Sequence, residues 1–120
     1  MERLKFRAWY RNQMYEVYEL NITGGMVAIS LPRFPFIQDV VPDVVMQFTG
    51  LLDKSGKEIY ERDIVKGYGY EVRNGHQIRP ERIFAINDFI KDTYRLLCIT
   101  EGTGETVEVI GNIYENPDLL

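Results

Sequence analysis

Three aspartates are the residues of this chain whose type and spacing come closest to a catalytic or metal-binding set. Asp88 and Asp92 are four residues apart, so on a helix both carboxylates would lie on one face and could share a divalent ion. Asp63 lies two residues after Glu61, and two neighbouring carboxylates could act as general acid and base. Together, Asp63, Asp88 and Asp92 would make the site of a hydrolase or nuclease.

Structural roles explain the same acids better. Calcium takes six or more oxygen ligands, and the helical pair supplies only two carboxylates. Acids at the start of a helix instead bind its free N–H groups and complement its dipole. Glu61 and Asp63 flank a corner of the chain, where an aspartate readily accepts hydrogen bonds from the backbone. We therefore predict no catalytic residues and no metal site, and the hydrolase is the least favoured function.

The chain contains one histidine and one cysteine, which excludes several kinds of site. A single histidine, His76, rules out a two-histidine metal site, and its place after Asn74-Gly75 predicts an exposed position on a hairpin. A single cysteine, Cys98, rules out an intramolecular disulfide and a multi-cysteine zinc site. Apolar neighbours predict that its thiol is buried and inert. No phosphate-binding loop is present in the sequence, and we expect no cofactor.

A cluster of basic residues near the N-terminus is the basis of a second function. Its members are Arg3, Lys5, Arg7 and Arg11. Aromatic residues lie between them, a combination that small β proteins use to bind single-stranded nucleic acid. The charge balance opposes this reading, because the chain carries a net charge of −4, all of it in the second half. Core packing is the favoured role of the aromatic residues, and weak nucleic-acid binding is kept as the alternative function.

Alternating apolar and charged residues at the N-terminus predict a β-hairpin. Residues 4–10 and 14–20 each alternate with a period of two, and the polar residues 11–13 can turn the chain. In the second run apolar side chains occur on both faces, so the pattern leaves open which side is buried. Residues 26–31 predict a further short strand.

Three prolines exclude a helix between residues 31 and 45. Proline fixes φ and cannot donate to a strand ladder, so this segment is predicted to be a structured loop or a sheet edge. Phe34, Phe36 and Ile37 are too apolar for a solvated linker, and we expect them to pack.

Beyond residue 44 the chain is predicted to form strands joined by tight turns, with one helix. The first elements are a strand at 44–49 ended by Gly50, a turn at 53–56, a buried pair at 59–60, a corner at 61–63 and a strand at 64–67. A hairpin turn at 73–75, a helix at 87–97, a strand at 107–113 and a helical turn after Asn116-Pro117 follow. Asn87 or Asp88 is expected to cap the helix, and apolar positions recur at helical spacing at Phe89/Ile90, Thr93/Tyr94 and Leu97.

The composition fits one small globular domain. Of 120 residues, 45% are apolar and 27% are charged, which argues against disorder. No run of 18 apolar residues occurs, so we predict no membrane span, and the N-terminus lacks the apolar core of a signal peptide. A cytoplasmic location in a bacterial host cell is expected.

Two long motifs give the chain a family resemblance. The stretch FTGLLDKSGKEIYERDIV, residues 48–65, and the tail VIGNIYENPDLL, residues 109–120, resemble segments shared by the YopX-like proteins of bacteriophages and prophages. The N-terminal KFRAW, Lys5 to Trp9, fits as well. The resemblance implies a single domain over 1–120, with an N-terminal hairpin and proline-rich part (1–47) and a barrel-like part (48–120). It implies a mainly β fold with an SH3-like small β-barrel in the second part, and it carries over no catalytic residues.

One residue departs from the family pattern. The family segment has glycine in EGDIV, where this chain has Arg62. An arginine would be strained if that position needed a positive φ, so we expect the corner to adopt a different turn here.

The favoured function is that of a non-enzymatic phage or prophage accessory protein that binds a protein partner. It rests on the lack of assembled catalytic chemistry together with the small β pattern. Exposed strands of an open sheet and the apolar segment 31–45 could also pair with a second copy of the chain.

Overall fold

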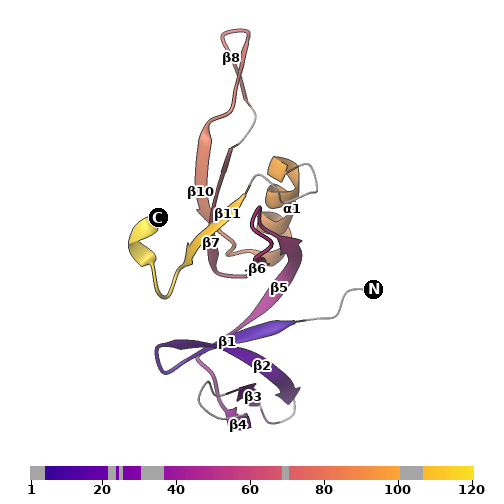
Figure 1. Cartoon of the computed structure of the whole chain (residues 1–120), viewed down its shortest axis with the longest axis vertical. Coiled ribbons are helices and arrows are strands. Elements are labelled where there is room, and N and C mark those ends of the chain that lie inside the picture. The colour runs from indigo at the N-terminus through magenta and orange to yellow at the C-terminus, as the bar shows by residue number, and fades with distance from the viewer. Residues whose placement is uncertain (1–4, 22–23, 25, 31–36, 69–70, 101–106) are drawn as a thin grey trace. The chain divides into compact units, whose positions relative to one another are not determined.

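The computed structural model describes residues 5–21, 24, 26–30, 37–68, 71–100 and 107–120. The chain divides into two compact units, residues 1–48 and residues 49–120, which are described in turn. The described residues are mainly antiparallel β-strands with one short α-helix and a terminal 3₁₀ turn (Figure 1), which confirms the predicted fold class at this level.

The first unit is an antiparallel sheet. Its strands are β1 (Phe6–Tyr10), β2 (Gln13–Asn21), β3 (Met26–Ser30), β4 (Ile37–Val40) and the beginning of β5 (Val44–Leu52). Their order is β4-β3-β2-β1-β5, so β4 lies at the edge of the described sheet. The predicted strand at 26–31 is confirmed over residues 26–30, and the predicted edge segment is confirmed over residues 37–40, with residues 31–36 outside the described part of the chain.

The hairpin of β1 and β2 is confirmed, with a tighter turn than predicted. Tyr10 pairs with Gln13, so only Arg11 and Asn12 form the loop. Both have positive φ, 48° and 61°, as a type I′ turn requires. This turn twists the strands in the sense that a sheet prefers.

A bulge in β2 explains why its apolar residues occupy both faces in the sequence. Val17 pairs with Ile29 and Leu20 with Val27, and the register shifts between Val17 and Glu19. The extra residue lets two positions three apart point the same way. Val17 and Leu20 accordingly both pack against the core of this unit.

That core is formed on one face of the sheet by Ala8, Val27, Ile29 and Val40, with Tyr10 and Tyr15 among the side chains packed against it. The predicted packing of Ile37 is wrong, because it lies three residues from buried Val40 in the same strand and so on the opposite face, where it is 44% exposed. Phe34 and Phe36 lie outside the described residues.

The second unit begins within β5. Its other elements are β6 (Glu58–Tyr60), β7 (Asp63–Tyr68), β8 (Glu71–Arg73), β9 (His76–Ile78), β10 (Glu81–Ala85), α1 (Phe89–Thr100), β11 (Glu108–Asn112) and the 3₁₀ turn η1 (Pro117–Leu119). Strand β5 continues through Gly50, which has a φ of 85°, so the predicted end of the strand at this residue is wrong.

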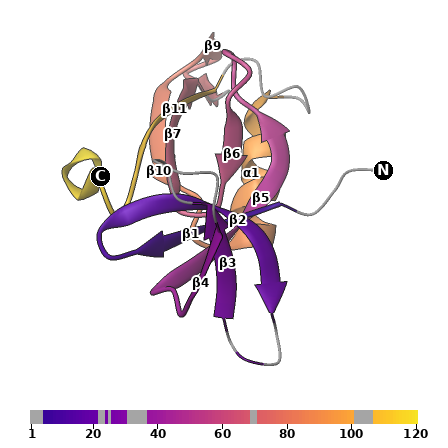
Figure 2. The same ribbon diagram turned by 60° about the horizontal axis from the view of Figure 1, so that its bottom comes forward.

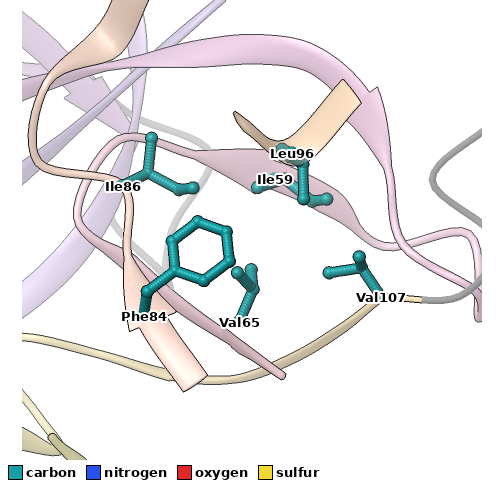
Figure 3. Packing of buried hydrophobic residues seen from close by; sticks show 6 residues of the cluster. All are labelled: Ile59, Val65, Phe84, Ile86, Leu96 and Val107. Carbon is teal, nitrogen blue, oxygen red and sulfur yellow. The ribbon is translucent and has the colours of Figure 1, made fainter. Parts of the chain in front are cut away.

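The sheets of this unit are open. Strands β10, β7 and β11 form one sheet, β8 pairs with β9, and β5 neighbours β6. The described strands therefore do not close into the SH3-like barrel that the family resemblance implied. Six buried side chains fill the core (Figure 3): Ile59, Val65, Phe84, Ile86, Leu96 and Val107.

The predicted apolar pattern of α1 is confirmed in part, because Phe89 and Thr93 are half-buried but Ile90 and Tyr94 are not. Leu96 is fully buried, whereas Ile90 is 82% exposed and Tyr94 is 69% exposed. In both views the helix lies beside the strand that carries Ile59 (Figures 1 and 2). The helix also runs to Thr100, three residues beyond its predicted end.

The corner before β7 holds Arg62 in a left-handed conformation. Its φ is 71°, so the expected change of turn is wrong: the arginine adopts the backbone geometry for which glycine is best suited. Main-chain bonds fix this geometry, since the Arg62 N–H donates to Ile86 O at 2.8 Å and the Ile113 N–H donates to Arg62 O at 3.0 Å. The side chain reaches Asn87, where Nη1 lies 3.0 Å from the main-chain oxygen.

We expect Arg62→Gly to be more stable than Arg62→Ala by about 1 kcal/mol. Both variants lose the guanidinium contact with Asn87, so the difference isolates the cost of a Cβ at this φ. Chemical denaturation of the two variants measures it. Equal stabilities would mean that the corner carries no left-handed strain.

The C-terminal tail folds around two asparagines. Asn112 is 8% exposed, and its Oδ1 accepts the N–H groups of Tyr114 and Glu115 at 3.0 and 2.9 Å. Asn116 Oδ1 accepts the Asn112 N–H at 3.2 Å, and the Asn116 side chain lies directly over Gly111. A Cβ at Gly111 would be 2.7 Å from Asn116 Cγ, so this position requires glycine for space.

Gly111→Ala is expected to lower the free energy of unfolding by roughly 2 kcal/mol, because the new methyl group would displace Asn116 and weaken the tail. Denaturation of the single variants and of the double variant with Asn116→Gly measures the coupling. The second substitution should recover part of the loss, and strictly additive effects would contradict the contact.

Candidate functional site

Asp53 accepts hydrogen bonds from three backbone N–H groups. Its side chain is buried, and Oδ1 accepts the N–H groups of Ser55 at 2.8 Å and Lys57 at 2.9 Å. Its other oxygen, Oδ2, accepts the Val109 N–H at 3.0 Å, 56 residues further along the chain. One carboxylate thus shapes the predicted turn after β5 and also ties that turn to β11.

These bonds lower the pKa of Asp53. Burial alone would raise it, but the N–H groups of Val109, Lys57 and Ser55 and the Lys57 charge together outweigh burial and favour the ionised form. The carboxylate is therefore charged at neutral pH and engaged with the backbone, which suits a structural group.

Asp63 has a similar local role. It is 1% exposed, and its Oδ2 accepts the Tyr60 N–H at 2.8 Å across the corner. Its carboxylate is directed at the main chain of its own turn and is shielded from solvent. This arrangement matches the structural role favoured from the sequence.

Asp88 and Asp92 cap the helix reciprocally. The Lys91 N–H donates to Asp88 Oδ1 at 2.9 Å. Asp92 Oδ2 accepts the N–H groups of Asn87 and Asp88 at 2.9 and 2.8 Å. The predicted cap is confirmed, and the helical pair serves the helix terminus. Within the described part of the chain, no three acidic, histidine or cysteine side chains gather as a metal site would require.

The described basic residues near the N-terminus are spread along β1 and the turn after it. Arg3 lies outside the described residues. Lys5 Nζ lies 5.8 Å from the centre of the Phe48 ring, and Arg11 stacks on Tyr10 at 5.1 Å. Arg7 pairs across the strands with Glu16, an acid on the same face. Six residues of extended chain separate Lys5 from Arg11, about 20 Å, so their charges act apart.

The single histidine and single cysteine add no chemistry to this picture. His76 is exposed at the start of β9, next to the Asn74-Gly75 turn, as predicted. Asn74 and Gly75 have φ values of 53° and 78°, which confirms the expected hairpin turn. The side chain of Cys98 lies outside the described part of the structure.

Sequence reasoning missed the exposed apolar pair of α1. Ile90 and Tyr94 are one helical turn apart and both face solvent. Phe89 and Thr93, which belong to the predicted pattern, are half-buried, and Leu96, which the prediction did not include, completes the buried face. Large apolar side chains left in water at helical spacing are a feature of partner-binding helices.

Comparison with known proteins places both units in one family. The family model described as YopX protein matches residues 5–120. The chain belongs to the YopX family. A crystal structure of protein EF1440 from Enterococcus faecalis is similar to it over 100% of this chain and 99% of that chain, with 28% sequence identity and a TM-score of 0.55. No curated protein gives a match.

The two YopX motifs recognised in the sequence coincide with the hydrogen-bonded turns described above. Asp53, Arg62 and Asp63 lie in the first motif, and Asn112 and Asn116 lie in the second. In this YopX family member, the described helix is too short to cross a membrane.

Asp53→Asn is expected to destabilise the chain by about 2 kcal/mol near pH 7, because an amide cannot accept all three N–H groups as a carboxylate does. The folded pKa of Asp53 is lowered, so its stabilisation is complete above the unfolded pKa and is lost as the pH falls through the folded value.

Denaturation between pH 2 and pH 7 measures this effect. The difference between wild type and Asp53→Asn should shrink in the acid range. A difference that is constant with pH would contradict the charged role of Asp53.

Proposed function

We propose that this chain is a non-enzymatic accessory protein of a bacteriophage or prophage, acting in the bacterial cytoplasm by binding a protein partner. The observation that carries the proposal is the solvent-facing pair Ile90 and Tyr94 on α1. Membership of the YopX family supports the phage setting, through the resemblance of its motifs.

The helix is well suited to present this pair. Its N-terminus is held by the two aspartate caps, and Leu96 anchors it in the core of the second unit. Residues spaced by four project on one side of a helix, so Ile90 and Tyr94 form one apolar stripe. Partner proteins commonly receive such a stripe in an apolar groove, with the i and i+4 side chains as anchors.

The hydrogen bonding of the acids supports a role without catalysis. Asp53, Asp63, Asp88 and Asp92 each accept backbone N–H groups close to their own turns. A general acid or base must reach a substrate and titrate near the working pH. Carboxylates occupied in this way are poorly placed for that task.

The double variant Ile90→Ser, Tyr94→Ser is expected to weaken partner capture at least about tenfold while leaving stability nearly unchanged, since both side chains are exposed. Quantified capture from lysate of phage-infected host cells, with tagged wild type and variant, measures the effect.

Val41→Ser is the matched control, because Val41 is 66% exposed and lies in the first unit. Equal capture by wild type and by the double variant would contradict a binding role for α1. A turnover of any substrate that depends on Asp63 would overturn the non-enzymatic assignment.

A further inference from the structure

The β8–β9 hairpin lies between β7 and β10 in the chain, and the strand pairs β7–β10 and β8–β9 are together called the ribbon. Tyr68 pairs with Glu81 in β7 and β10, and Glu71 pairs with Ile78 in β8 and β9. Both pairs follow a single antiparallel register. The inner part of the ribbon is joined by β11, whereas β8 and β9 pair only with each other among the described strands. Figure 1 shows the hairpin extending beyond the three-stranded sheet.

The end of this ribbon has a small excess of basic residues, since residues 71–82 hold three arginines and the two acids Glu71 and Glu81. Residues 72–80 include Arg73, His76 and Arg79 and contain no acid, although the chain as a whole has a net charge of −4. All three side chains are exposed, as are Asn74 and Gln77. Arginine, asparagine, glutamine and histidine side chains are the usual donors to phosphates and to base edges.

Glu71, an acid of the hairpin itself, pairs with the guanidinium groups of two arginines in the ribbon. Glu71 Oε1 lies 2.8 Å from Arg73 Nη2, and Glu71 Oε2 lies 2.9 Å from Arg82 Nη2. Hydrogen bonding from Arg73 is the main cause of the lowered pKa of Glu71, which is therefore ionised at neutral pH. This carboxylate orders the arginines and also competes with any external anion for them.

The dimensions of the hairpin suit a duplex. A two-stranded ribbon fits the major groove of B-form DNA, which is about 12 Å wide, and β8 with β9 extends about 10 Å along the strands. The narrow major groove of A-form RNA does not admit such a ribbon. An acidic protein surface would also attract these arginines, but it offers no groove of this width as a general feature.

We propose that the hairpin formed by residues 71–78, with Arg79, binds double-stranded DNA, with Arg73 and Arg79 on the phosphates and the Asn74-Gly75 tip directed into the major groove. The inference goes beyond the protein partner proposed above and uses a different surface. It replaces the N-terminal basic cluster as the nucleic-acid-binding element, because that cluster is dispersed.

Fluorescence polarisation with a labelled 20-base-pair DNA duplex tests the proposal on the full chain. Binding is expected at 50 mM salt with a Kd on the order of 10⁻⁶ to 10⁻⁴ M, and roughly 10- to 40-fold weaker binding at 200 mM salt for two to three phosphate contacts. Absence of binding at 50 mM salt overturns the proposal and leaves the protein partner standing.

Two variants that are expected to change the affinity for the duplex in opposite directions locate the contact with DNA. Arg79→Ala should weaken binding roughly fivefold and reduce the salt slope by about 1, and Glu71→Gln should tighten binding several-fold by releasing Arg73 and Arg82. Lys91→Ala and Glu108→Gln make the same charge changes elsewhere and should have little effect.

Three results would overturn the assignment. Equal effects of Arg79→Ala and Lys91→Ala would mean that only net charge matters. Loss of binding with Lys5→Ala or Arg11→Ala, but not with Arg79→Ala, would return the contact to the N-terminal cluster. Stronger binding to a polyglutamate peptide than to the duplex would identify an acidic protein as the ligand. Thermal unfolding of each variant establishes that the fold is retained.

Discussion

The hydrogen bonds of the Asp53 carboxylate organise the second unit. Two of them close the turn between β5 and β6, and the third reaches Val109 in β11. The Lys54 N–H also donates to Val107 O at 2.8 Å, so the turn is joined to the strand by main chain as well as side chain. Val107 and Ile59, which flank these bonds, are both fully buried in the same core. A group that fixes a local turn therefore also brings together segments distant in sequence.

Other polar side chains of the family motifs also bind the backbone, but at shorter separations along the sequence. Asp63 binds the backbone across its own corner, and Asn112 with Asn116 folds the tail. Buried or half-buried polar groups need partners, and here the partners are N–H groups that no strand ladder would satisfy. The two conspicuous motifs of the sequence consequently encode turns, and their acidic and amide side chains bind the backbone of those turns.

Local features of the fold were predictable because their causes are local. The Asn74-Gly75 hairpin, the turn at Asp53 and the cap at Asp88 each follow from side chains within a few residues. Which face of α1 packs against the core could not be predicted in the same way, because Ile90 and Tyr94 are as apolar as the residues that are buried there. The partnership of Asp53 with Val109 depends on strand order, which no short spacing reveals. The bulge in β2 hid its buried face for a similar reason.

The candidate surfaces were therefore harder to predict than the fold. Arg7 and Arg11 are close in sequence, but Arg7 lies in β1 and Arg11 in the turn that follows, and each residue of an extended strand adds about 3.3 Å. The ribbon, by contrast, returns on itself, so that Arg73 and His76 become direct neighbours across the strands. Residues become neighbours on a surface where the chain turns back on itself. The Asn74-Gly75 turn could be predicted from the sequence, but the side chains that the turn brings together could not.

The single register shared by the inner and outer ribbon has an evolutionary consequence. Because β8 and β9 contribute no side chain to the core cluster of the second unit, selection for folding acts on them mainly through the turn and the ladder. Substitution of their outward side chains therefore leaves the residues of that core cluster unchanged. A few substitutions at the tip of the ribbon would thus change the surface of this unit without repacking its core, much as changes in a loop do on a rigid framework.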